Sequence, residues 1–261
     1  MNDSPTPVHR SASTGFAAKA DRYVRGRPDY PDAIVEWLRS RLGLREGKVA
    51  LDLGAGTGTF TTYLLRTGAR VIAVEPVQQM REQLGRACPD VDAREGTATS
   101  IPLPDASVDA VTCAQAFHWF ATRNALAEIC RVLKPGGKLG LIWNTRDENI
   151  AWVAKLTQII TPYEGDTPRF AKGTWKLAFP FDGLSALHED HFGHAHTGSP
   201  EDVIIDRIRS TSFIAALPAD EEAKVVAKLR ALIADTPELA GRDVISMPYD
   251  TVAFSATKTN A

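Results

Sequence analysis

A glycine-rich segment that contains an aspartate is the first part of the chain whose residue types could do chemistry. Residues 51–59 are Leu-Asp-Leu-Gly-Ala-Gly-Thr-Gly-Thr and stand between an apolar run and a helical pattern. A strand, a glycine loop and a helix in this order are typical of sites for nucleotide-like ligands. Two common versions fit poorly: Thr59 replaces the third glycine of the dinucleotide fingerprint, and the Gly-Lys-Ser/Thr of a phosphate-binding loop is absent.

Two carboxylates indicate which ligand the loop binds. Asp52 lies two positions before Gly54, where it would repel a pyrophosphate and attract a cationic amine. Glu75 ends the next apolar run, 21 residues after Gly54, the offset at which an acidic side chain can accept hydrogen bonds from ribose hydroxyls. A ribose and a cation in one ligand indicate S-adenosylmethionine as the cofactor.

These residues need a sheet to position them, and the sequence from residue 48 to residue 144 predicts one. Short apolar runs alternate there with helical patterns, and the runs cover residues 49–53, 70–75, 91–95, 108–114 and 138–143. Runs that are apolar on both faces suit parallel strands covered by helices. A helical stripe that includes Leu126 and Leu133 ends at Lys134-Pro-Gly-Gly137, which is a helix stop. The predicted fold class is α/β: a doubly wound, mostly parallel, Rossmann-like sheet with helices on both faces.

The two ends of the chain are predicted to complete this core. Ile34, Leu38 and Leu42 share one helical face, so a helix over residues 30–42 precedes the first strand. The weaker pattern after residue 144 predicts helices near 150–160, 200–211 and 219–234, and strands near 187–197 and 244–255 that extend the sheet. These late helices would form a small cap over the carboxyl edge of the sheet, where ligands bind in such folds. The predicted parts are a tail and cofactor lid (1–29), a cofactor-binding core (30–146), and a C-terminal part with the cap helices and the last two strands (147–261).

Four motifs in order resemble one known family. They are Asp52-Leu-Gly-Ala-Gly-Thr-Gly58, Glu75-Pro76, Ile101-Pro-Leu-Pro-Asp-Ala-Ser-Val-Asp109 and Arg131-Val-Leu-Lys-Pro-Gly-Gly137. Over about residues 21–143 the chain resembles the class I S-adenosylmethionine-dependent methyltransferases, specifically the group with the type 11 methyltransferase domain. The resemblance implies that Asp52, Gly54 and Gly56 border the methionine part of the cofactor. It also implies that Glu75, followed by Pro76, holds the ribose.

The same resemblance suggests further contacts with the cofactor. In this family the loop after the third strand usually meets adenine through an acidic residue. Here that loop is Glu-Gly-Thr97-Ala98, and the hydroxyl of Thr97 would make a weaker hydrogen bond. Gln115 follows the fourth strand, where the methyl group should lie. Tyr23 and Arg27 belong to a run that resembles the lid of this family and could close on the cofactor carboxylate; the alternative is that they only cap the helix that follows.

His118 is the candidate for proton transfer. Methyl transfer from a sulfonium is an in-line displacement, so alignment of nucleophile, methyl and sulfur can supply most of the acceleration. A hydroxyl or protonated amine acceptor also needs a base, and His118 lies just after the fourth strand, where the methyl should lie. The alternative is a packed, hydrogen-bonded histidine among Phe117, Trp119 and Phe120, which would form core or pocket wall.

Two further polar clusters lie beyond the fourth strand. One consists of His188, His191, His194 and His196. On an extended strand His191 faces away from the other three, so a partly exposed strand is favoured and no metal is predicted. The other is the segment 143–147, Trp-Asn-Thr-Arg-Asp, which ends the fifth strand and is a more plausible source of polar contacts to the substrate.

Composition narrows the class of protein. The 261 residues include 30 Lys plus Arg and 32 Asp plus Glu, a net charge of −2, which excludes a generally basic nucleic-acid binder. No apolar run approaches the ~20 residues of a membrane span, and residues 1–13 are polar, so we expect a cytoplasmic protein without a membrane partner. Cys88, Cys113 and Cys130 are too few and too scattered for a disulfide framework and are expected to be buried thiols.

The expected function is methyl transfer to a small molecule. The Asn/Asp-Pro-Pro-aromatic signature expected of adenine amino-methyltransferases of nucleic acid is absent after the fourth strand. Alternatives are a nucleic-acid or protein methyltransferase, or a regulatory module that binds S-adenosylmethionine without catalysis. A nicotinamide oxidoreductase is the alternative at the level of fold, and Asp52 and Thr59 argue against it. The methyl acceptor, the methylated atom and the oligomeric state stay open.

Overall fold

One seven-stranded sheet runs through the molecule. The computed structural model describes residues 28–259, so Tyr23 and Arg27 lie outside the described residues. The strand order is β3-β2-β1-β4-β5-β7-β6. The strands are β1 (Val49–Leu53), β2 (Arg70–Val74), β3 (Asp92–Arg94), β4 (Val108–Ala114), β5 (Leu133–Arg146), β6 (His188–Gly198) and β7 (Ile245–Thr257).

The sheet is mostly parallel, as predicted. β1 to β5 run in one direction, because each is parallel to its neighbours in the order β3-β2-β1-β4-β5. β7 lies antiparallel between β5 and β6, so the last two strands extend the sheet beyond β5 as expected. The chain enters the sheet at β1, continues through β2 to β3 at one edge, and then returns to form β4 on the other side of β1. This reversal between β1 and β4 opens a crevice at the carboxyl ends of the two strands, where doubly wound folds bind ligands.

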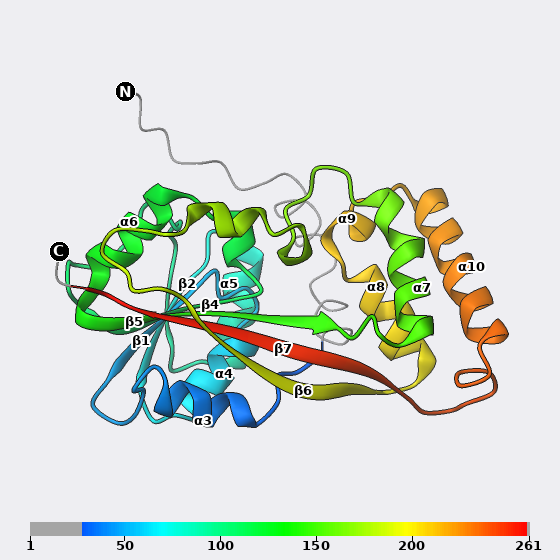
Figure 1. Ribbon diagram of the computed structural model, residues 1–261, viewed down its shortest axis with the longest axis horizontal. Helices are drawn as coiled ribbons and strands as arrows, with labels where there is room; N and C mark the ends of the chain where they lie inside the picture. The colour runs from blue at the N-terminus through cyan, green and yellow to red at the C-terminus, as the bar shows by residue number, and fades with distance from the viewer. Residues whose placement is uncertain (1–27, 260–261) are drawn as a thin grey trace.

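Helices cover both faces of the sheet. α3 (Ala33–Ser40), α4 (Thr59–Leu65) and α5 (Gln78–Ala87) pack on one face, and α6 (Arg123–Val132) packs on the other. Figure 1 shows α3 and α4 on the side of the sheet opposite α6. Successive residues of a strand point into opposite cores: Ala50 belongs to the core under α3 and α4, and Leu51 belongs to the core under α6. The prediction of helices on both faces is therefore confirmed.

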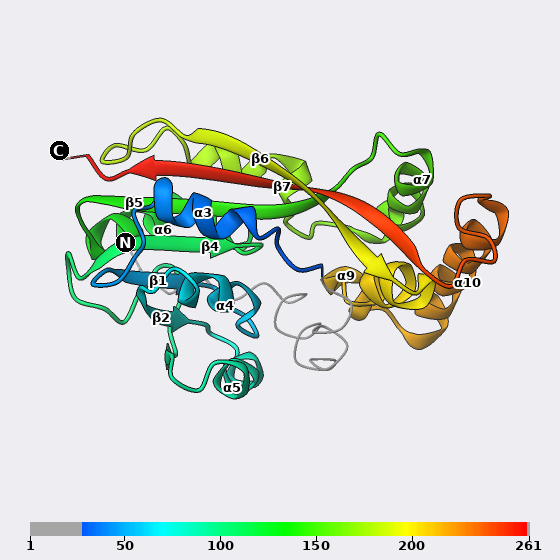
Figure 2. The same ribbon diagram turned by 90° about the horizontal axis from the view of Figure 1, so that it is seen from below.

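The C-terminal third forms the predicted helical cap. Its helices are α7 (Ala151–Ile160), α8 (Arg207–Arg209), α9 (Ser212–Ala215) and α10 (Ala219–Asp235). They gather at one end of the molecule, where β5 ends and β7 begins (Figures 1 and 2). Apolar side chains such as Val153, Ile208 and Leu229 form a core of their own there, together with Met247 from the start of β7. This cap therefore has its own hydrophobic support beside the carboxyl end of β5.

Some local expectations differ from the structure. β5 begins at Leu133 instead of residue 138, because Leu133 already pairs with Val108 once α6 has ended at Val132. The helix expected over residues 200–211 is split into a π-helix, η5 (Glu201–Asp206), and α8. Cys130 is only partly buried, unlike the other two cysteines. Short 3-10 helices occur at η1 (Phe117–Trp119), η2 (Thr161–Tyr163), η3 (Phe170–Lys172) and η4 (Thr174–Ala178).

In the part of the chain that the structure describes, residues 28–259, no helix has both the length and the apolar character that crossing a bilayer requires. The longest helix of the cap, α10, carries Asp220, Glu221 and Glu222 in its first turn. Such a helix instead places its apolar stripe, including Val225 and Leu229, against the core of the cap.

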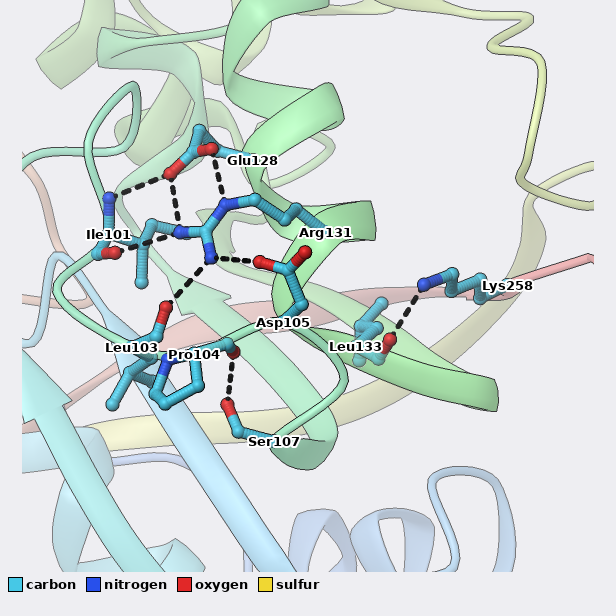
Figure 3. A network of polar contacts seen from close by, with 9 residues as sticks. All are labelled: Ile101, Leu103, Pro104, Asp105, Ser107, Glu128, Arg131, Leu133 and Lys258. Carbon is cyan, nitrogen blue, oxygen red and sulfur yellow. Dashed lines mark hydrogen bonds and ion pairs between the residues drawn. The ribbon is translucent and has the colours of Figure 1, made fainter.

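An arginine of α6 holds the segment that leads from β3 to β4 (Figure 3). The Arg131 guanidinium donates hydrogen bonds to the carbonyls of Ile101 at 2.9 Å and Leu103 at 2.8 Å, and to the Asp105 carboxylate at 2.8 Å. Glu128 accepts two bonds from Arg131 and a third from the Ile101 N–H at 3.0 Å. The motifs at residues 101–109 and 131–137 are therefore joined into one structural unit. This unit fixes the segment next to the loop after β3.

Candidate functional site

A cavity of about 170 Å³ lies at the carboxyl ends of β1, β2 and β4. Its wall contains every predicted cofactor residue that the structure describes: Asp52, Gly54, Gly56, Glu75, Pro76, Thr97, Ala98 and Gln115. We call it the cofactor cavity. His118 lines a neighbouring cavity instead. The crevice at the reversal of strand order thus brings together residues from four separate segments of the chain.

The glycine loop turns tightly from β1 into α4. The N–H groups of Gly54 and Ala55 both donate to the carbonyl of Val74, at 2.8 and 3.2 Å, so the loop closes onto the end of β2. Gly54 has a φ of +73°, and a Cβ there would lie 2.8 Å from the Cβ of Ala116. A larger residue at position 54 would both strain the backbone and collide with the segment after β4. The glycine is therefore required by the close approach of two chain segments at the cavity.

Glu75 connects the end of β2 to the glycine loop. Its two carboxylate oxygens accept hydrogen bonds from the N–H groups of Gly56 and Val77, each at 3.0 Å. Arg81 donates to the carbonyls of Glu75 and Pro76 at 2.7 and 2.8 Å, which fixes this turn. Burial raises the pKa of Glu75, while the two N–H groups and Arg81 act to lower it. Each oxygen keeps a lone pair that can accept from a ligand hydroxyl.

Asp52 is a buried carboxylate with one satisfied oxygen. The residue is 1% exposed, and Oδ2 accepts a hydrogen bond from Thr61 Oγ1 at 2.7 Å. Oδ1 is buried and has no hydrogen-bond partner within residues 28–259. Burial raises the pKa of Asp52 to about 7, against the hydrogen bond from Thr61 and with a smaller contribution from the nearby charge of Glu75. An unpartnered anionic oxygen in a cavity favours a cationic group on the ligand.

The donors and acceptors of this cavity fit S-adenosylmethionine. Glu75 offers acceptors for hydroxyls and Asp52 offers a negative charge for an ammonium, while Met80 and Ala98 add apolar wall. The same two carboxylates would repel the pyrophosphate of a dinucleotide. The Asp52 oxygen without a partner is the strongest sign that a ligand group belongs there.

Gln115 and Asn144 stand where the cofactor cavity meets its neighbour. Gln115 has a φ of +56°, an unusual value for a residue other than glycine, and its Nε2 donates to the Asn144 carbonyl at 3.2 Å. The Asn144 side chain accepts from Thr251 Oγ1 at 2.6 Å and donates to the Asp29 carbonyl at 3.1 Å. Asn144 thereby ties β5 to β7 and to the segment before α3. The two residues form a rigid boundary between the cavities.

The neighbouring cavity has a volume of about 150 Å³ and lies between the end of β5 and the cap. It shares Gln115, Trp119, Asn144 and Arg207 with the cofactor cavity, so the two are contiguous. The rest of its wall is made of His118, Thr145, Arg146, Glu148, Pro168, Arg169, Phe170, Ala171, Thr211, Ser212 and Phe213. We call it the second cavity. Three residues of the segment 143–147, from which the sequence predicts substrate contacts, line it.

His118 is held by a buried tryptophan. Trp143 Nε1 donates a hydrogen bond to His118 Nδ1 at 3.0 Å. Trp143 is fully buried, and its ring centroid lies 4.8 Å from those of Phe170 and Trp175. Because Nδ1 accepts this bond, the proton of the neutral imidazole is on Nε2. The contact agrees with the alternative of a packed, hydrogen-bonded histidine, and the base role stays a prediction.

The histidines of β6 have different partners. His188 Nε2 lies 2.6 Å from Arg41 Nη2, His191 Nδ1 lies 2.6 Å from Asp250 Oδ2, and His194 Nδ1 lies 3.3 Å from Thr251 Oγ1. In residues 28–259 no group of three or more His, Cys, Asp or Glu side chains is placed to hold a metal ion. The Asp250 carboxylate raises the pKa of His191 through its hydrogen bond. These contacts stabilise the edge of the sheet.

Sequence reasoning missed several wall residues. Arg207 lines both cavities from the first turn of α8, and Arg169 reaches the second cavity from the loop before η3. Tyr30 and Phe60 also line the cofactor cavity, where their rings pack at a centroid distance of 4.9 Å. Tyr30, Arg169 and Arg207 stand in no motif with a fixed spacing to the glycine loop, whereas Phe60 follows Gly58 by two positions. Arg207 stands between Asp206 and the nearby Arg209, so its charge gave no distinctive signal in the sequence.

Comparison with known proteins identifies the family of the chain. Residues 51–141 match the family described as "Methyltransferase domain". The chain is 40% identical over 247 residues to the uncharacterized methyltransferase-like protein C25B8.10 of Schizosaccharomyces pombe, which covers 94% of this chain and 96% of that protein. It is 40% identical over 252 residues to the uncharacterized methyltransferase Rv3342 of Mycobacterium tuberculosis, which covers 97% of this chain and 99% of that protein.

A solved structure supports the fold independently. The proposed type II methyltransferase from Anaeromyxobacter dehalogenans superposes with a TM-score of 0.67 at 23% identity, over 89% of this chain and 97% of that chain. This likeness concerns the sheet and its helices. The family assignment follows from the full-length relatives, the matching domain and the cavity that brings the motifs together. The chain therefore belongs to the class I methyltransferases that use S-adenosylmethionine as their cofactor.

Proposed function

We propose that the protein transfers the methyl group to a small-molecule acceptor. The observation that carries this proposal is the second cavity, which has about 150 Å³, adjoins the cofactor cavity and is walled on one side by the cap. A partly open cavity of this size next to the methyl donor suits a small metabolite. The net charge of −2 argues against nucleic acid, because it supplies no general attraction to phosphates.

In this proposal the cofactor is held by the residues of its cavity. Glu75 accepts hydrogen bonds from the ribose hydroxyls, and Asp52 binds the ammonium of the methionine part through Oδ1, which has no partner among residues 28–259. Gly54 and Gly56 let the loop approach the same part of the ligand. Thr97, with Ala98 beside it, meets the adenine from the loop after β3. Pro76 and Gln115 complete the wall.

The reaction depends mainly on the alignment of the acceptor atom, the methyl carbon and the sulfur. When bound, the cofactor supplies a methyl carbon that is made electrophilic by a positively charged sulfur. The glycine loop and the two carboxylates would hold the cofactor in the cavity that adjoins Gln115 and Asn144. The acceptor atom forms its bond to the methyl carbon while the carbon–sulfur bond breaks, with its electron pair left on sulfur. The cap orients the acceptor in line and excludes water.

His118 is the candidate base for an acceptor that must lose a proton. Its imidazole lines the second cavity, which is the side of the junction where the acceptor lies in this proposal. The bond from Trp143 restricts the role, because a proton could be taken at Nε2 only by the tautomer that carries its hydrogen on Nδ1. That tautomer would face the Trp143 N–H with another N–H. The geometry supports a positioning role for His118 more than proton transfer.

A transfer assay tests the choice of acceptor. The protein is incubated with S-adenosylmethionine labelled in its methyl group and, separately, with a small-metabolite ultrafiltrate, total nucleic acid and total protein from the same cells. We expect label in the ultrafiltrate alone. Label in nucleic acid or protein would move the assignment to those alternatives. Binding of S-adenosylhomocysteine by calorimetry without label in any fraction would favour a regulatory module that does not catalyse transfer.

A further inference from the structure

The second cavity carries an excess of positive charge. Arg146, Arg169 and Arg207 all line it, and Glu148 is the one carboxylate in its described wall. Glu148 is itself exposed and accepts a hydrogen bond from Thr157 at 2.9 Å. Three guanidinium groups around a space of this size are costly unless anions compensate them. The partners of each arginine therefore decide what the cavity is built to hold.

Within residues 28–259, two of the three arginines have no acidic partner. Arg169 forms an ion pair with Glu164, a carboxylate that it shares with Lys172 at 3.1 Å. Arg207 is 9% exposed and donates to two neutral groups, Tyr249 Oη at 3.2 Å and Thr211 Oγ1 at 3.3 Å. Arg146 forms no ion pair within residues 28–259, and its Nε is buried without a hydrogen-bond partner there. Arg146 and Arg207 thus leave guanidinium charge uncompensated.

The surroundings of Arg146 destabilise its charged form. Burial and the neighbouring charges of Arg207 and Arg169 lower the pKa of Arg146 to about 10, against the opposing effects of Tyr249 and Glu148. An arginine is retained at such a place when its planar donors bind a carboxylate or phosphate in the functional state. A bound anion would supply both the hydrogen-bond acceptor and the compensating charge.

The two cavities have opposite electrostatic character. Asp52 Oδ1 in the cofactor cavity and Arg146 Nε in the second cavity are the two buried atoms of charged side chains without a hydrogen-bond partner in the described part of the chain. The first is an acceptor on an acidic residue and the second is a donor on a basic one. A cationic ligand and an anionic ligand would therefore occupy adjacent cavities, with Arg207 in the walls of both.

On the basis of the proposed function, we propose that the methyl acceptor is a small organic anion whose carboxylate or phosphate group binds to Arg146 and Arg207. The aromatic wall formed by Trp119, Phe170 and Phe213 contacts the organic part of the acceptor. Arg169, paired with Glu164 and 5.5 Å from the Phe213 ring centroid, supports that wall. The acceptor is thus selected by charge at one end and by apolar contact at the other.

The test begins with matched compounds. Labelled methyl transfer is measured for small carboxylic acids and phosphate monoesters, each beside its neutral counterpart, the carboxamide or the parent alcohol. We expect transfer to anions and none to their neutral counterparts, and the comparison of acids with phosphates identifies which group the arginines recognise. Equal transfer to neutral compounds, or transfer to them alone, would overturn the inference.

Variants connect this selectivity to the residues. Arg146→Met should raise KM for the anionic acceptor by about 10- to 100-fold, the loss expected when a charged hydrogen-bond donor is removed. The matched control is Arg230→Met, which removes the same charge from an exposed arginine of α10 whose side chain is 64% exposed, and its KM should stay within about twofold. Because Arg146 Nε is buried and has no hydrogen-bond partner in the described part of the chain, Arg146→Met should also raise Tm by at least about 2 °C without ligand.

Calorimetry with S-adenosylhomocysteine distinguishes a failure of this inference from a failure of the proposed function. We expect Arg146→Met to bind it as tightly as the parent, because the arginine serves the acceptor. A variant that loses affinity for S-adenosylhomocysteine and keeps its acceptor KM would show that Arg146 binds the cofactor carboxylate, which overturns the inference. If Arg146→Met does not fold, Arg146→Gln is measured in its place. Absence of methyl transfer to any small molecule by the parent would instead contradict the proposed function.

Discussion

The Trp143 indole donates its N–H to Nδ1 of His118 at 3.0 Å, and this bond limits what the histidine can do. Trp143 is fully buried at the end of β5, so its N–H cannot turn to another acceptor without repacking the aromatic cluster. The neutral imidazole is consequently held as the tautomer protonated at Nε2. A histidine in this state donates from Nε2 and accepts at Nδ1, which is the reverse of what a base at Nε2 requires.

The first prediction concerns substitution of His118. His118→Leu leaves the buried Trp143 N–H without its acceptor, so we expect a loss of about 1 to 3 kcal/mol in the free energy of unfolding. Turnover at saturating substrates should fall less than about tenfold. His118→Asn, whose side-chain oxygen can accept from Trp143, is the control and should recover part of the stability. A turnover loss of about 10² to 10⁴ in both variants, with a changed acidic limb of the pH profile, would establish a general base.

The second prediction concerns the ribose contact of Glu75. Glu75→Gln keeps one oxygen and replaces the other by a donor, so affinity for S-adenosylhomocysteine should fall by about 1.5 to 3 kcal/mol, or roughly 10- to 150-fold. Tm should fall as well, because Gly56 or Val77 loses its acceptor. Calorimetry with the 2′,3′-dideoxy analogue is the control: its affinity should change much less. Equal losses for both ligands would mean that Glu75 acts only through the shape of the loop.

The third prediction is a pH dependence of cofactor affinity. Asp52 has a pKa of about 7, so lowering the pH from about 7.5 to about 5.5 protonates it and removes the charge that attracts an ammonium. S-adenosylhomocysteine should bind more weakly in acid, by up to about tenfold per pH unit below the pKa. Asp52→Asn should bind weakly with little pH dependence. 5′-Methylthioadenosine, which lacks the ammonium, should show no such dependence with the parent; an identical dependence would assign the effect to another group.

The fourth prediction concerns stability without ligand. Burial raises the Asp52 pKa above its ordinary value of 3.8, so between pH of about 4 and about 7 the folded state holds a proton that the unfolded state has lost. The contribution of Asp52 to stability is then present at low pH and is lost as the pH rises through that window, by up to about 4 kcal/mol. Asp52→Asn should match the parent near pH 4 and melt at a higher temperature near pH 7.5. Equal melting at both pH values would show that Asp52 stays ionised at little cost.

The parts of the site that the sequence predicts are those made by neighbouring residues. Asp52, Gly54 and Gly56 follow one strand, and Glu75 ends the next, so a local strand-loop-helix pattern is enough to bring them to one edge of the sheet. The electrostatics of the second cavity could not be found in this way. Its arginines converge from β5, from a loop and from a three-residue helix.

The difference between local sequence pattern and contacts of distant segments also explains how much of the fold could be predicted. The parallel core follows from apolar runs that need cover on both faces, whereas the split at residues 201–209 depends on how the cap packs. His118 illustrates the limit for single residues: its position after β4 predicts a place near the reaction, but only the packing of Trp143 shows which nitrogen is occupied. Side-chain protonation is a property of contacts between distant segments, and local pattern does not record it.

The last prediction tests the unit that joins the third and fourth motifs. Arg131→Met removes the donor of bonds to the Ile101 and Leu103 carbonyls and leaves Glu128, whose side chain is 22% exposed, without its counter-ion. We expect a loss of about 2 to 3 kcal/mol in the free energy of unfolding, hence a Tm lower by roughly 4 to 12 °C. Arg123→Met is the control on the same helix: its side chain is 58% exposed and its carboxylate partner is 3.7 Å away, so its Tm should change little. Because the network anchors the segment beside the adenine loop, Arg131→Met should also weaken S-adenosylhomocysteine binding, while Arg123→Met should not. If both variants melted alike and bound the ligand equally, the network would have no role in positioning the site.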